Sequence, residues 1–107
     1  MTEQKKTRRQ LLDEFVSQNP GDAFSRYGLA IECMNSGDSA AADSHFLTLI
    51  ERSPDYVPAY LMFAQFLVRE DRSPEAKKVL TDGIAAAIKN GDSHARSELE
   101  ALLTELS

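Results

Sequence analysis

The sequence has few of the features that mark disulfide-bonded, secreted or membrane proteins. Its one cysteine, Cys33, excludes an internal disulfide and fits a reducing compartment. The longest apolar stretch, residues 60–68, is interrupted by Gln65 and is far shorter than the ~20 residues that cross a bilayer. No apolar run follows the basic N-terminal residues, so a secretory signal peptide is not expected. We therefore expect a cytoplasmic protein that does not contact the membrane.

Catalytic and metal-binding motifs are also missing. The sequence has no HExxH, no CxxC, no glycine-rich phosphate loop and no nucleophile-elbow pattern. His45 and His94 are 49 residues apart, and no carboxylate or thiol motif links them. We expect Cys33 to be a small buried apolar residue and not a nucleophile. The sequence predicts no enzyme activity, no cofactor and no metal site.

Basic residues are fewer than acidic residues in this sequence. The chain has 12 lysines and arginines against 17 aspartates and glutamates, which gives a net charge of −5. Nucleic-acid binding needs a clustered positive surface, so no nucleic-acid partner is expected. A local exception is the group Lys5, Lys6, Arg8 and Arg9. We interpret this group as a solvated first helical turn, with a functional basic arm as the alternative.

Helical periodicity is present nearly throughout the sequence, whereas sustained two-residue alternation is absent. Proline, glycine and capping residues divide the pattern into helices predicted at residues 3–18, 23–35, 39–52, 57–70, 73–89 and 93–106. The first helix is expected to place a single packing stripe on one side, made of Leu11, Leu12, Phe15 and Val16. All the turns are short, so successive helices are expected to pack as antiparallel hairpins.

The apolar pattern repeats every 34 residues. Ala30 recurs as Ala64, Phe46 recurs as Leu80, and Pro20 recurs as Pro54. A period of this length with two amphipathic stretches in each unit is typical of a helical solenoid, in which each unit stacks on its neighbours. An unrelated helical bundle is the alternative.

These residues resemble the tetratricopeptide repeat family, which uses 34-residue helix-turn-helix units with small residues where the helices cross. The small residues are Ala30 and Ala42 in one unit and Ala64 and Ala76 in the next. The resemblance implies an all-α, antiparallel helix-hairpin solenoid that forms a single domain over residues 1–107. Its parts would be a leading helix at 1–22, repeats at 23–56 and 57–90, and a capping helix at 91–107.

The resemblance also implies a concave groove lined by the first helix of each repeat. Pro58 also stands at an inward place, and the residues expected to bind a partner there are Phe24, Tyr27, Ile31, Met34, Asn35, Leu61, Gln65, Val68 and Arg69. Because the inward places hold few cations, the family's clamp for a C-terminal carboxylate is not expected. The apolar groove could be covered by the chain's own last helix, by another copy of the protein, or by an apolar peptide or helix of a partner.

The sequence thus predicts a protein-interaction module that binds an apolar peptide or helix of a protein partner. The alternative is a self-assembling structural scaffold, either a homo-oligomer or a chain whose groove is filled by its own C-terminal helix.

Overall fold

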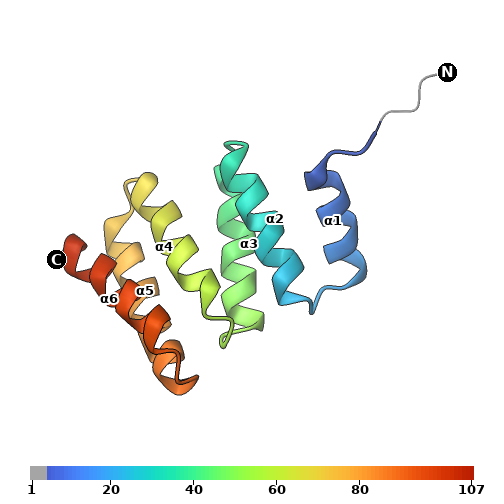
Figure 1. Cartoon of the computed structure of the whole chain (residues 1–107). Coiled ribbons are helices and arrows are strands. Elements are labelled where there is room, and N and C mark those ends of the chain that lie inside the picture. The colour runs from blue at the N-terminus through green and yellow to red at the C-terminus, as the bar shows by residue number, and fades with distance from the viewer. Residues whose placement is uncertain (1–4) are drawn as a thin grey trace. The chain divides into compact units, whose positions relative to one another are not determined.

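A computed structural model of the protein describes residues 5–107, which form six α helices joined by short turns (Figure 1). The helices are α1 (Arg8–Gln18), α2 (Ala23–Asn35), α3 (Ser39–Arg52), α4 (Pro58–Arg69), α5 (Ser73–Lys89) and α6 (Ser93–Leu106). Residues 5–107 contain no strand, which confirms the all-α prediction. In this range, no helix combines the length and the apolarity needed to cross a membrane.

The chain forms two compact units. The N-terminal unit ends at Leu49 and the C-terminal unit comprises residues 50–107, so the boundary falls within α3. Helix α1 packs against α2 in the first unit. In the second unit, α5 packs against both α4 and α6, and α6 also contacts α4.

The predicted helix ends agree with the observed ends to within one residue for α2 to α6. The prediction for the first helix is wrong at its start, because residues 5–7 are not helical and α1 begins at Arg8. The predicted start at Glu3 lies outside the described residues. Thr7 has an extended backbone and accepts a hydrogen bond from the Gln10 amide at 3.1 Å, while the Gln10 side chain accepts one from the Thr7 amide at 2.8 Å. This capping box stops the helix from extending toward the N-terminus.

The turns between helices have the backbone conformations that their residues favour. Gly37 and Gly91 have positive φ angles of 80° and 68°, as expected for residues that follow a helix end. Asp71 stands 34 residues after Gly37 and has a φ of 60°. Asp22 caps α2, as predicted, by accepting a hydrogen bond from the Ser25 amide at 3.3 Å. These residues end one helix and start the next within a few positions.

The core of the N-terminal unit is built from one face of each helix. Val16 of α1 is 5% exposed. The other buried apolar residues of this unit come from α2 and α3, and they are Leu29, Ala30, Cys33, Ala42, Phe46 and Leu49. Cys33 has no exposed surface, which confirms its predicted buried position.

The C-terminal unit has a larger core of the same design. Its fully buried residues include Ala64, Ala76 and Leu80, the counterparts of Ala30, Ala42 and Phe46 in the N-terminal unit. Each of the six side chains has no exposed surface, so residues 34 positions apart have equivalent burial in the two units.

Helix α5 lies close to α4 at Gly83. A Cβ atom at this position would lie 2.6 Å from the Tyr60 Cβ and 2.9 Å from its Cγ. Tyr60 is in turn held by its hydroxyl, which donates a hydrogen bond of 2.6 Å to the carbonyl oxygen of Pro54. Only a residue without a side chain allows the two helices to pack at this distance.

Candidate interaction surfaces

The residues predicted to line the groove lie on two helices, one in each unit. Helix α2 carries the five predicted residues of the N-terminal unit, and helix α4 carries the four of the C-terminal unit. We describe the two sets separately and call them the α2 face (Phe24, Tyr27, Ile31, Met34 and Asn35) and the α4 face (Leu61, Gln65, Val68 and Arg69).

The α2 face is apolar and open to solvent at its N-terminal end. Phe24 is 74% exposed, the largest exposed fraction among the exposed large apolar residues described. Tyr27, Ile31 and Met34 are half-buried, and Asn35 is exposed at the last turn. Burial raises the pKa of the Tyr27 hydroxyl, so this group is protonated at neutral pH. The α2 face therefore presents neutral side chains, with polar groups near its C-terminal end.

The α4 face borders an open hollow of about 280 Å³ between α4 and α6. Leu61 and Gln65 line it from α4, and α6 contributes a carboxylate-edged wall of Glu98, Ala101, Leu102 and Glu105. Val68 is half-buried and Arg69 is exposed, further along α4. Helix α6 thus forms one wall of this hollow, and Leu61 beside it retains partial exposure. The lining residues of α6 were not among the predicted site residues.

The prediction that α1 has a single packing stripe is only partly correct. Val16 is buried and Leu12 is half-buried, but Leu11 is 55% exposed and Phe15 is 46% exposed. The helix therefore buries only part of its apolar surface and leaves Leu11 and Phe15 largely exposed. Leu11 and Phe15 border an open hollow of about 400 Å³ that is also lined by Arg8, Leu12 and Ser25.

The basic residues near α1 form ion pairs within the N-terminal unit. Arg8 lies 2.7 Å from Glu32, and Arg9 lies 2.8 Å from Asp38. The hydrogen bond from Arg9 is the main reason that the pKa of the Asp38 carboxyl is lowered, and the Ala41 amide adds to the effect. These contacts link the first turn of α1 to the far end of α2.

Two titratable side chains of the N-terminal unit, Cys33 and His45, have pKa values shifted by their surroundings. Burial raises the pKa of the Cys33 thiol, which keeps the sulfur in its unreactive protonated form. The pKa of His45 is lowered by burial and then by the nearby Arg26 guanidinium, whose Nη1 is 3.5 Å from Nδ1 of the histidine. Across residues 5–107, no three histidine, cysteine or acidic side chains are grouped so as to hold a metal ion.

The arrangement of antiparallel hairpins with a 34-residue period defines a helical repeat protein. Similar solved structures identify the family of helical repeat proteins. A crystal structure of a tetratricopeptide repeat domain protein from Salinibacter ruber is 32% identical, covers 79% of this chain and 94% of that chain, and has a TM-score of 0.73. A solution structure of a tetratricopeptide repeat domain protein from the same organism is also 32% identical, covers 82% of this chain and 89% of that chain, and has a TM-score of 0.78.

A more distant relative carries the same description. A TPR repeat-containing protein from Pseudomonas aeruginosa is 23% identical over 95 residues, which cover 89% of this chain and 90% of that protein. No model of a known protein family matches the sequence. Because the two Salinibacter ruber proteins are 32% identical to this chain over most of their length, the chain belongs to the tetratricopeptide repeat family. Proteins of this family generally act as interaction modules and not as enzymes.

Proposed function

We propose that this protein is a non-enzymatic interaction module that binds apolar side chains of a partner peptide or helix. The observation that carries the proposal is Phe24, which is 74% exposed and shares one face of α2 with Tyr27 and Ile31. Fully burying a large apolar side chain stabilises a complex by ~1.5–3 kcal/mol. A row of apolar residues that stays partly exposed on one helix face is typical of a protein-binding site.

The α4 face supports the same function in the C-terminal unit. Leu61 supplies apolar contact area beside an open hollow, and Gln65 supplies both a donor and an acceptor. Asn35 and Arg69 are exposed at the last turns of α2 and α4, where they can donate hydrogen bonds to backbone carbonyls of the partner. In this proposal the apolar residues provide affinity, and the polar residues set the orientation of the bound segment.

The predicted ligand is an apolar segment and not a C-terminal carboxylate. Recognition of a buried carboxylate requires cations that pair with it. Among the predicted inward residues, the fifth and ninth places of the two repeats hold Tyr27, Ile31, Leu61 and Gln65, none of which carries a positive charge at neutral pH.

We also propose a cytoplasmic site of action, because the buried Cys33 thiol suits a reducing compartment.

Selection from a displayed peptide library tests this function. The wild-type protein should enrich amphipathic peptides with apolar residues at helical spacing. Ile31→Glu should lose those peptides, because it places a charge in the middle of the α2 face. Leu47→Glu is the matched control, since Leu47 is a 42% exposed apolar residue of α3 outside both faces. The control should bind like the wild type.

Far-UV circular dichroism separates loss of binding from loss of folding. Ile31→Glu should retain wild-type helical content, because Ile31 is half-buried and not part of the core. If no peptide is enriched by the wild type, or if Ile31→Glu and Leu47→Glu bind equally, the proposed function is wrong.

A further inference from the structure

Arg26 and His45 form a contact in the N-terminal unit that joins α2 to α3. Nη1 of Arg26 lies 3.5 Å from Nδ1 of His45, and both side chains are half-buried. A guanidinium can only donate hydrogen bonds, so Nδ1 of the histidine is the acceptor and carries no proton. The contact therefore requires the neutral form of His45 with its proton on Nε2.

The 34-residue period gives Arg26 and His45 counterparts in the C-terminal unit. Tyr60 stands 34 residues after Arg26, Val79 stands 34 residues after His45, and both counterparts are buried. Burial raises the pKa of the Tyr60 hydroxyl, so this group is neutral at physiological pH. The C-terminal unit therefore has uncharged side chains at these two places. The N-terminal unit has a permanent cation and a titratable ring there instead.

Arg26 also makes a hydrogen bond that corresponds to one of Tyr60. The Tyr60 hydroxyl donates a hydrogen bond of 2.6 Å to the carbonyl oxygen of Pro54. Nη2 of Arg26 donates one of 3.4 Å to the carbonyl oxygen of Pro20, which stands 34 residues before Pro54. Arg26 thus occupies the place of the tyrosine, and it links the turn before α2 to His45 on α3.

The charges that face His45 come from three parts of the N-terminal unit. Burial lowers the pKa of His45 most, followed by Arg26 of α2, and Arg9 of α1 lowers it further. Asp13 of α1 and Asp38, which precedes α3, act in the opposite direction. Asp38 is itself paired with Arg9 at 2.8 Å. The net result is a pKa below the ordinary value of 6.5, so the neutral ring is the stable form in the folded protein.

We propose that the Arg26–His45 pair is a pH-sensitive contact, which holds α2 against α3 at neutral pH and loosens when His45 takes up a proton. A proton on Nδ1 removes the acceptor and places two positive charges side by side. The contact acts on the helix that carries the α2 face, but it does not depend on the binding of a partner by that face.

The direction of the pH effect follows from the two states of the protein. His45 has a lower pKa in the folded state than in the unfolded state, so the unfolded chain binds the proton more tightly. The contribution of His45 to stability is therefore complete above about pH 6.5 and is lost as the pH falls through the folded pKa.

NMR of the ¹⁵N-labelled protein tests the proton positions. At about pH 7.5 the His45 ring should be protonated on Nε2 and not on Nδ1. During an acid titration, His45 should take up its proton below pH 6.5, and the amide signals of α2 and α3 around it should shift together with the ring. Arg26→Gln should raise the midpoint of the His45 titration, because it removes the adjacent charge.

Urea unfolding at about pH 7.5 and about pH 5.5 tests the effect on stability. The wild type should have a lower urea midpoint at the acidic pH. The double variant Arg26→Tyr/His45→Val copies the pair found in the C-terminal unit, and its midpoint should be the same at both pH values. Ordinary carboxylates titrate below this range, so they contribute little to the difference.

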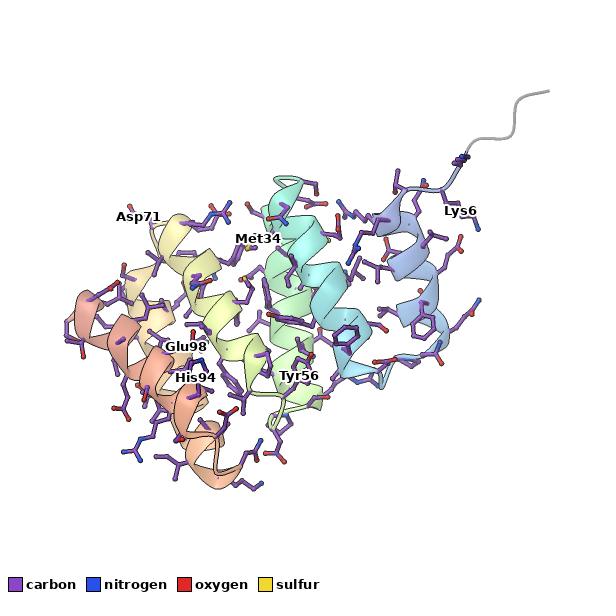
Figure 2. All side chains as sticks on the ribbon, viewed as in Figure 1. Lys6, Met34, Tyr56, Asp71, His94 and Glu98 are labelled. Atoms are coloured by element: carbon purple, nitrogen blue, oxygen red, sulfur yellow. The ribbon has the colours of Figure 1, made fainter. Side chains whose placement is uncertain are left out.

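His94 provides the matched control, because the sequence contains two histidines. Its side chain is 88% exposed, and its Nε2 lies 3.1 Å from Oε1 of Glu98 on the same helix (Figure 2). A proton on His94 would strengthen this pair instead of breaking it. His94→Gln should therefore retain the loss of stability that the wild type shows in acid.

Several results would overturn the proposal. Two of them need no variant, namely a proton on Nδ1 of His45 at neutral pH and a His45 titration at or above pH 6.5. An unchanged midpoint in Arg26→Gln would do the same, as would a full acid response in the double variant or its loss in His94→Gln. The NMR results decide the question if the double variant does not fold. None of these measurements involves a partner, so their failure and the failure of the peptide selection are separate outcomes.

Discussion

The contact between Gly83 and Tyr60 leads to a prediction in which two similar substitutions have opposite effects. Gly83→Ala places a Cβ atom 2.6 Å from the Tyr60 Cβ, about 1 Å closer than ordinary contact between carbon atoms. Gly28→Ala places a Cβ atom no closer than 3.7 Å to the Leu12 side chain, which is ordinary contact. Both glycines lie within helices, so alanine gives the same gain in helix propensity at each position.

The structure sets the size of the two effects. Replacing a helical glycine with alanine stabilises a helix by ~0.8–1 kcal/mol, and Gly28→Ala should gain about that amount. Overpacking in a core costs ~1–3 kcal/mol. The cost at Gly83 should lie toward the upper end, because the atom it meets is the Cβ of Tyr60 and not the end of a flexible side chain. After the propensity gain, Gly83→Ala should be destabilised by ~1–2 kcal/mol.

Urea unfolding followed by circular dichroism at 222 nm measures both variants against the wild type. We expect the free energy of unfolding of Gly28→Ala to exceed that of Gly83→Ala by ~2–3 kcal/mol. Equal gains at the two positions would show that α4 and α5 are not packed as closely as described, and the reasoning would be wrong.

Three further predictions concern single residues. Asp71→Gly should raise the free energy of unfolding by ~0.5–1 kcal/mol in urea titrations, because Asp71 has a φ of 60°, which glycine adopts without strain. Thr7→Ala should lower it by ~1 kcal/mol and increase hydrogen exchange at the Gln10 amide, which loses its cap. Arg9→Ala should reduce the loss of stability in acid, measured by unfolding at pH 3 and 7. Asp38 has a lower pKa in the folded state than in the unfolded state, so its contribution is present above about pH 4 and is lost as pH falls through the folded pKa.

The 34-residue period made most of the interior predictable. The recurrence of Ala30 as Ala64 at the same register predicts that both lie at helix crossings, and both are fully buried. The period also relates Gly37 to Asp71, which share a positive φ even though aspartate rarely adopts it. Residues that recur every 34 positions occupy equivalent places in successive helix hairpins, so they share backbone conformation and burial.

The outer surfaces were less predictable. Periodicity shows that Leu11 and Phe15 lie on one side of α1, but it does not show whether another helix covers that side. One available signal was Arg8, which stands where Ala42 and Ala76 occur in the two repeats. A long charged side chain at that place does not suit a close helix crossing. Glu98 and Glu105 were missed because α6 departs from the 34-residue register, so the sequence does not indicate which of its residues face α4.

The single cysteine provides a natural probe of one part of the molecule. Cys33 is fully enclosed in the N-terminal unit, and the sequence contains no second thiol. A thiol reagent can reach its sulfur only when that unit opens, so the labelling rate reports the frequency of local opening without any introduced cysteine. The same sample, observed by circular dichroism, reports the helices of both units and shows whether they unfold together or one after the other.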